Sequence, residues 1–157
     1  MRIQKRTTMP SPGVGAAAGS IAAAAWLALH PLTRRVSGID FDDTRLLGRM
    51  VVPNGPWRLV GTVMHLVNGA VFGALFVRFL KRPSVGKGFA AAQIENAVLW
   101  PTLALIDPIH PDRRNGHWPR FMTSPRIIVS EVIGHAIFGT VLGALTSRAL
   151  KRGDGDA

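Results

Sequence analysis

The chain has 157 residues, of which 47% are hydrophobic, and a formal net charge of +10 at pH 7. It contains no cysteine, which excludes disulfides, thiolate metal sites and cysteine nucleophiles. In a soluble protein such a basic balance would suggest a nucleic-acid partner. Here most basic residues lie at the ends of long apolar segments, so we expect no nucleic-acid partner and assign them to the orientation of membrane spans.

The first apolar segment covers residues 13–30 and carries no charged residue. As a helix it would be about 27 Å long, close to the thickness of a bilayer's hydrocarbon core. The basic stretch MRIQKR before it also fits a cleavable signal peptide. We favour a retained span, because a later segment of the chain matches this one.

Residues 31–56 follow as a predicted outer loop. Asp42 or Asp43 would cap a helix in which the apolar residues of LLGRMVV recur at helical spacing. The pattern predicts a short helix that lies on the outer membrane interface. A solvated loop is the alternative.

Two longer apolar segments, residues 57–80 and 127–150, are the clearest predicted spans. Their arginines lie near the ends, where long side chains reach the lipid headgroups. Both contain the template HxxxGxxxGALxxRxLKR, which begins at His65 and again at His135, 70 residues later. This repetition indicates an internal duplication.

The third predicted span, residues 88–106, is the weakest by hydropathy, because polar residues lie in its middle. The duplication requires it as the partner of the first span. The two segments align at Gly13, Gly15 and Ile21 with Gly86, Gly88 and Ile94. We therefore predict an all-α integral membrane protein, a single membrane domain over 1–157, with four transmembrane helices as two tandem helical hairpins. Residues 107–126 would form a second outer loop.

The orientation follows from charge and aromatic residues. Short basic stretches lie at both chain ends and between the second and third spans, as is typical of the cytoplasmic side. The tryptophans fall toward the other side, at positions Trp26, Trp57, Trp100 and Trp118. We expect both termini in the cytoplasm and, from the Ala-, Gly- and Arg-rich composition, a bacterial cytoplasmic membrane.

A few polar side chains fall inside the predicted spans, where they are costly and therefore candidates for function. They are His65, Asn68, Gln93, Glu95, Asn96, Glu131 and His135. All of them except Gln93 form the candidate cluster. Glu131 and His135 are four residues apart on one helix face, where a carboxylate can hydrogen-bond an imidazole. The set predicts a buried cluster that takes up and releases protons or binds a cation. The alternative is a polar clasp that fixes helix packing in a structural or accessory membrane subunit.

The two histidines lie at equal depth, about 12 Å below the outer boundary. Haem ligated by both imidazoles is therefore a further alternative. Each histidine is followed by two glycines that indicate close helix packing: Gly69, Gly73, Gly139 and Gly143. Such packing leaves little room for a macrocycle, so we expect no cofactor.

The stretch DPIHPDRRNGHW in the second outer loop contains four residue types that bind zinc. They are Asp107, His110, Asp112 and His117. The prolines and arginines among them favour an ordinary loop over a metal site. The chain lacks GxSxG, HExxH, P-loop and dinucleotide motifs, so we expect that it is not an enzyme.

A Gly- and Ala-rich first span, an outer loop with a short leucine-containing helix, and later spans of the form HxxxGxxxGAL resemble the small bacterial inner-membrane proteins of the YagU-like kind. The likeness covers most of the chain and rests on the two histidines and the four glycines that follow them. It implies a location and a fold, and no chemistry. Because four spans offer little room for a pathway, we expect a homo-oligomer or a membrane partner protein, with the lipid bilayer around it.

Overall fold

The computed structural model describes residues 9–155, with side chains up to Arg152, and all regular elements in that part of the chain are helices. Three helices are long and apolar enough to cross a membrane: α1 (Pro12–Ser37), α3 (Trp57–Phe79) and α7 (Pro125–Gly155). The chain thus has the character of a helical membrane protein. The basic stretch MRIQKR lies outside the described residues.

The first helix, α1, is longer than the apolar segment 13–30 predicted. The Ser11 hydroxyl caps its start, and the helix continues through Pro31 to Ser37. A proline inside a helix removes one backbone hydrogen bond but does not always end the helix. Gly38 ends it, with a φ of 69°, a left-handed conformation that glycine adopts without strain.

The helices α1 and α3 cross with their backbones in contact. A Cβ atom added to Gly19 would overlap the carbonyl oxygen of Gly69, and one added to Gly73 would overlap that of Gly15. Only glycine fits at these positions, as in small-residue packing between membrane helices. The predicted packing residues of the second span therefore lie at a helix crossing.

The helices α4 (Val85–Leu99) and α7 cross in the same way. A Cβ atom on Gly88 would overlap the carbonyl oxygen of Gly139, and one on Gly143 would overlap that of Ser84. In each helix pair, two glycines of the HxxxGxxxG segment on one helix thus lie against the backbone of the other helix.

The predicted third span, residues 88–106, is not one helix. The structure divides it into α4, which has 15 residues, and α5 (Thr102–Ile106). Pro101 explains the break, because its ring has no N–H to bond the carbonyl four residues earlier and clashes with that carbonyl. At about 22 Å, α4 is shorter than a bilayer's hydrocarbon core of about 30 Å.

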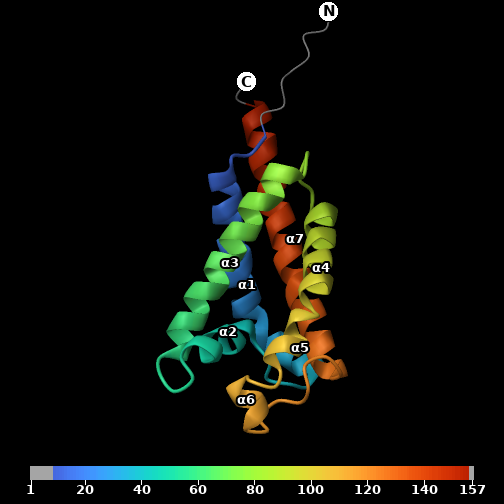
Figure 1. Ribbon diagram of the computed structural model, residues 1–157. Coiled ribbons are helices and arrows are strands. Elements are labelled where there is room, and N and C mark those ends of the chain that lie inside the picture. The colour runs from blue at the N-terminus through green and yellow to red at the C-terminus, as the bar shows by residue number, and fades with distance from the viewer. Residues whose placement is uncertain (1–8, 156–157) are drawn as a thin grey trace, which may run out of the picture.

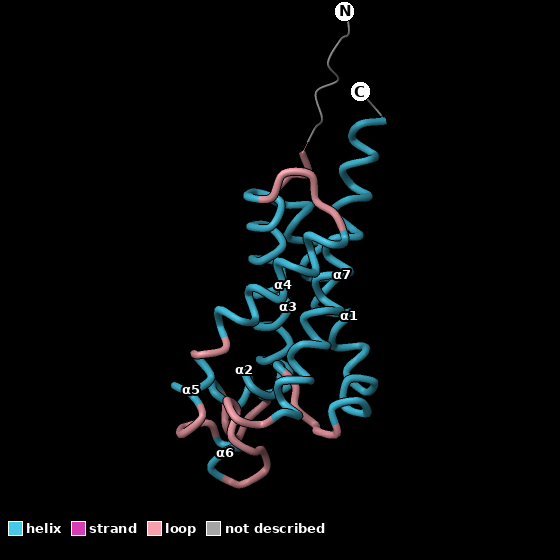
Figure 2. The backbone as a smooth tube through the Cα atoms, turned by 90° about the vertical axis from the view of Figure 1, so that its right-hand side faces the viewer, coloured by secondary structure: helices cyan, strands magenta, loops and turns pink. Residues whose placement is uncertain are grey.

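The long helices form a bundle in which α1 packs against α7, α3 packs on α1, and α4 packs on α7. The first described residues and the end of α7 lie at one end of this bundle (Figure 1). The short helices α2 (Asp43–Val51), α5 and α6 (Pro111–Arg114) lie at the opposite end, here named the α2 end (Figures 1 and 2). The predicted outer loops therefore contain helical structure and share one end.

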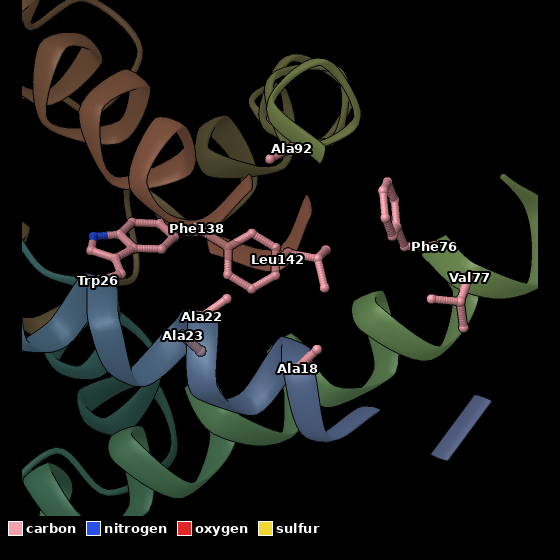
Figure 3. Close-up of a cluster of buried hydrophobic side chains, with 9 residues drawn as sticks. All are labelled: Ala18, Ala22, Ala23, Trp26, Phe76, Val77, Ala92, Phe138 and Leu142. Carbon is pink, nitrogen blue, oxygen red and sulfur yellow. The ribbon is translucent and has the colours of Figure 1, made fainter. Parts of the chain in front are cut away.

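Two hydrophobic cores hold these parts together. The first lies between the long helices (Figure 3) and consists of Ala18, Ala22, Ala23, Trp26, Phe76, Val77, Ala92, Phe138 and Leu142. The second lies at the α2 end and consists of Phe41, Leu46, Leu103, Trp118, Phe121 and Ile127. Because the second core draws on α2, α5 and the start of α7, it fixes the short helices under the bundle.

Candidate functional site

A cavity of about 200 Å³ lies inside the bundle, above the second core. Side chains from α1, α2, α3, α4, α5 and α7 line it. All six residues of the predicted cluster are among them: His65, Asn68, Glu95, Asn96, Glu131 and His135. The structure thus brings residues from three separate segments to one site.

One half of the site is formed by His65 and Asp43. The Nδ1 atom of His65 lies 3.5 Å from Oδ2 of Asp43, and both side chains are largely buried. The Nε2 atom of His65 has no hydrogen-bond partner among residues 9–155. Asp43, the first residue of α2, therefore supplies the carboxylate nearest to this imidazole.

Two glycines bring α2 close enough to place Asp43 there. A Cβ atom on Gly61 of α3 would overlap the carbonyl oxygen of Thr44, and one on Gly48 would overlap that of Trp57. The backbones of α2 and α3 are therefore in direct contact. Asp42 caps α2 by accepting a hydrogen bond of 2.7 Å from the backbone N–H of Arg45.

The other half is formed by His135 with two glutamates. Its Nε2 atom lies 3.5 Å from a carboxylate oxygen of Glu95, on α4. Its Nδ1 atom lies 3.8 Å from the carboxylate of Glu131 and 2.8 Å from that residue's backbone oxygen. The predicted i, i+4 pair is thus in contact, but the hydrogen bond of the imidazole runs to the backbone of Glu131 and not to its carboxylate.

Trp26 of α1 lies against both imidazoles. The ring centroids of Trp26 and His65 are 5.0 Å apart at an interplanar angle of 78°, and those of Trp26 and His135 are 4.8 Å apart at 60°. A Cβ atom on Gly134 would overlap the indole ring, so this glycine provides the space for it. The indole therefore connects the two halves of the site.

The amide side chains have different roles. Asn68 and Asn96 line the cavity from α3 and α4. Gln93 instead donates a hydrogen bond of 3.0 Å to the backbone oxygen of Val132 and so links α4 to α7. Polar residues of α4 therefore serve both the cavity and helix packing.

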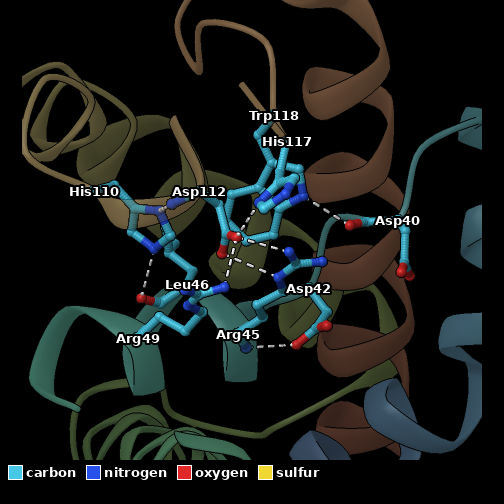
Figure 4. Close-up of polar contacts among 9 residues, drawn as sticks. All are labelled: Asp40, Asp42, Arg45, Leu46, Arg49, His110, Asp112, His117 and Trp118. Carbon is cyan, nitrogen blue, oxygen red and sulfur yellow. Dashed lines mark hydrogen bonds and ion pairs between the residues drawn. The ribbon is translucent and has the colours of Figure 1, made fainter. Parts of the chain in front are cut away.

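A second polar cluster joins α2 to the loop that contains α6 (Figure 4). The buried Asp112 carboxylate accepts hydrogen bonds of 3.0 and 2.7 Å from Arg45 and of 2.9 Å from Arg49. The ring of His117 lies 3.1 Å from the same carboxylate. His110 stacks on Trp118 at 5.1 Å. This cluster fastens α2, and with it Asp43, in place.

The titration of this second cluster follows from its contacts. Burial raises the pKa of Asp112, but hydrogen bonds and charge from Arg45, with His117 and Arg49, outweigh it and hold the pKa below its usual range. Burial also lowers the pKa of His110, which its hydrogen bond with the Leu46 carbonyl offsets only in part. Asp112 is therefore held as a carboxylate and His110 as a neutral ring.

These contacts replace the metal site considered for the loop. Asp107 pairs with Arg113 at 2.7 Å, and Asp112 pairs with Arg45 and Arg49. Over residues 9–155, no group of three or more histidine and acidic side chains is arranged to hold a metal ion.

A haem does not fit between the two histidines of the cavity. Pockets that enclose drug-sized ligands measure about 300–1,000 Å³, whereas this cavity measures about 200 Å³. Trp26 also contacts both imidazoles. The bis-histidine alternative would therefore require the indole to leave its place.

Comparison with known proteins adds no further constraint: no family model, curated protein or solved structure matches this chain. The resemblance to YagU-like proteins accordingly stays a prediction.

Sequence reasoning missed two members of the site, Asp43 and Trp26. The sequence predicts Asp43 only as a helix cap and Trp26 only as a residue of the membrane interface. The available signal for Asp43 was the pair Gly48 and Gly61, which permits α2 to lie on α3. For Trp26 the signal was Gly134, directly before His135.

Proposed function

We propose that this chain is an integral membrane protein whose cavity takes up and releases protons through Asp43, His65, Glu95, Glu131 and His135. The observation that carries the proposal is that each of two imidazoles lies 3.5 Å from a carboxylate of another helix, within one cavity. Imidazole titrates near physiological pH, and the carboxylates supply the counter-charge that its protonated form needs.

A proton is favoured over a coordinated metal ion as the species that binds. The cluster has the residue types for a cation, but no metal-holding arrangement exists within residues 9–155. Protons require only donor and acceptor atoms that come within hydrogen-bonding distance after small movements. The contacts of 3.5 to 3.8 Å around His135 meet that condition.

We further propose that the helices form two hairpins related by duplication, α1 with α3 and α4 with α7, in a bacterial cytoplasmic membrane with both termini inside. Equivalent glycine contacts at the two crossings support the duplication. The short helices, with Trp57, Trp100 and Trp118, lie toward the α2 end, which supports placing that end outside. In this topology α4 returns the chain across the membrane, and α5 follows it at the outer side.

A second candidate is a structural or accessory subunit in which the same polar residues only hold helices together. The hydrogen bond from Gln93 to the Val132 backbone favours it, because this polar group of α4 already acts in packing. The two candidates differ in one measurable respect: a packing clasp has no proton exchange to lose.

The test is proton flux into liposomes that contain the purified protein and an internal pH dye. Wild-type protein should raise the flux above that of empty liposomes, and Glu131→Gln should return it to that level, because glutamine keeps shape and hydrogen bonding but not charge. His30→Gln is the matched control, since His30 bonds the Phe41 backbone oxygen outside the cavity. The accessory subunit would be favoured if wild-type protein gave no more proton flux than empty liposomes and the cavity variants only unfolded at lower temperature.

A second readout uses Trp26. A protonated imidazole in contact with an indole quenches its fluorescence, so the emission that Trp26→Phe removes should change from about pH 8 to about pH 5. The change should be altered in His65→Gln and His135→Gln and retained in His30→Gln. Emission from Trp26 that is independent of pH would contradict proton uptake at this site.

A further inference from the structure

The residues that line the cavity indicate that it opens sideways, between α3 and α4. The helices α1 and α7 form its back wall with Trp26, Glu131 and His135, and α2 and α5 close it toward the α2 end. Although α3 and α4 line it from opposite sides, they form no packed interface with each other in the described chain. Figure 2 shows α3 and α4 on one side of the bundle and α1 and α7 on the other, and Figure 1 shows α3 and α4 at its two flanks.

This opening lies at the depth of the membrane spans. His65 and Asn68 are about 12 and 16 Å along α3 from Trp57, well inside a helix of 23 residues. Leu99 of α4 lines the cavity and remains exposed, and Phe72 of α3 lines it from the other side. A molecule that reaches the cavity by this route comes from the lipid, so it must partition into a bilayer.

The charged groups of the cavity are acidic or are imidazoles. The titratable side chains that face it are Asp43 from α2, His65 from α3, Glu95 from α4, and Glu131 and His135 from α7, with Asp42 beside the first; α1 and α5 contribute none. Although the chain has 19 Lys and Arg residues, none lines the cavity among the described residues. A ligand that gains charge complementarity here is a cation.

The size of the cavity limits the ligand to a small one. A dry cavity of about 150 Å³ holds one benzene molecule, and this one measures about 200 Å³. It therefore accommodates one ring with a short substituent. Trp26 offers an aromatic surface next to the carboxylates, which suits an ammonium group.

We propose that the cavity binds a small amphiphilic amine, one ring or short chain with a single ammonium group, which enters from the lipid between α3 and α4. Glu95, whose side chain is 30% exposed, meets the ammonium first, and the apolar part lies against Phe72 and Leu99. Binding releases a proton from the acidic cluster, so that charge in the cavity is conserved. This proposal rests on the proposed proton uptake and names the molecule exchanged for the proton.

The test uses benzylamine, a cation at neutral pH, with benzyl alcohol as its neutral counterpart of similar shape. With wild-type protein in lipid nanodiscs, benzylamine should produce a saturable change in Trp26 emission and release about one proton per bound molecule, read with a pH dye. Benzyl alcohol should bind at least about tenfold more weakly and release none.

The matched variants are Glu95→Gln, which removes the charge at the opening, and Asp40→Asn, which removes an exposed carboxylate elsewhere at the α2 end. Glu95→Gln should weaken benzylamine binding by at least about tenfold, and Asp40→Asn should leave it unchanged. Glu131→Gln provides a second cavity variant if Glu95→Gln does not fold.

Equal binding of benzylamine and benzyl alcohol, or equal benzylamine binding by wild type and both glutamine variants, would overturn this inference. If the Trp26 emission still titrates without ligand, the proposed proton uptake stands and only the amine is wrong. If that titration is also absent, both proposals fail.

Discussion

Replacing Asp112 by asparagine should lower the free energy of unfolding by about 3 kcal/mol. The Asp112 side chain is 0% exposed and accepts three hydrogen bonds from Arg45 and Arg49. Asparagine has nearly the same volume but no charge, so the two guanidinium groups would be left without a counter-charge. Removing one partner of a buried ion pair costs about 3–5 kcal/mol. Because Arg45 and Arg49 retain 21% and 16% exposure, water screens part of this cost, and we expect the lower end of the range.

The measurement is unfolding in mixed detergent micelles, followed by circular dichroism at increasing fractions of sodium dodecyl sulfate. Asp40→Asn is the matched control, because its carboxylate is 55% exposed and lies 3.8 Å from Arg34. An exposed pair of this kind contributes less than about 1 kcal/mol. Equal losses for Asp112→Asn and Asp40→Asn would refute the reasoning from burial.

The pH dependence gives a second check. Since the folded pKa of Asp112 lies below its unfolded value of about 3.9, this carboxylate contributes stability that is present above the unfolded pKa and is lost as the pH falls through the folded pKa. The stability difference between wild type and Asp112→Asn should therefore be constant from about pH 7 to about pH 5 and shrink below about pH 4. A difference that grows on acidification would contradict the assignment of a paired carboxylate.

Three further predictions follow from the helix contacts and the proposed topology. Gly19→Ala should destabilise the protein by about 1–3 kcal/mol, because the added Cβ overpacks the helix crossing. Gly86→Ala is the control: its added Cβ would meet nothing within 4 Å, so it should be neutral or stabilising by up to about 1 kcal/mol. Equal effects of the two substitutions in unfolding experiments would argue against backbone contact at Gly19. Gly61→Ala should push α2 away from α3 and alter the pH response of Trp26 emission, because His65 then loses the Asp43 carboxylate, and an unchanged response would show that Asp43 is not needed. Reporter fusions after Arg82 should face the cytoplasm and those after Gly116 the outside, and the reverse result would invert the orientation.

The long helices and the glycine contacts were predictable because their signals are local. Uncharged runs of the right length predict spans, and an HxxxGxxxG segment places histidine and glycines near one helix face. The cavity required more, since it depends on how four helices and α2 are arranged. Glu95 illustrates this limit: its segment suggested an intramembrane carboxylate, but only the crossing at Gly88 and Gly139 places it 3.5 Å from His135.

Two prolines, one directly after the first apolar segment and one within the third, show why helix ends were harder to predict. Pro31 lies inside α1, whereas Pro101 separates α4 from α5. Hydropathy and local propensity treat them alike. The difference arises from tertiary contacts: after Pro31 the side chains of Thr33 and Ser37 are buried with the helix intact, while after Pro101 the chain turns and buries Leu103 in the second core.

The register of the proposed duplication has a consequence for the site. The sequence aligned Gly15 with Gly88, but the contacts make Gly19 and Gly88 equivalent, because Gly19 meets the carbonyl of Gly69 as Gly88 meets that of Gly139. The two alignments differ by four residues, about one helical turn.

With the register set by these contacts, Trp26 of α1 occupies the position that Glu95 occupies in α4. The two histidines are therefore not interchangeable. Both contact the indole of Trp26, but His65 takes its carboxylate from α2, whereas His135 faces a carboxylate of α4. In a strict duplication both halves would present the same group, and either two carboxylates or two indoles would meet between the histidines. The observed combination places an apolar aromatic surface beside an acidic one, which is the combination that an amphiphilic cation requires.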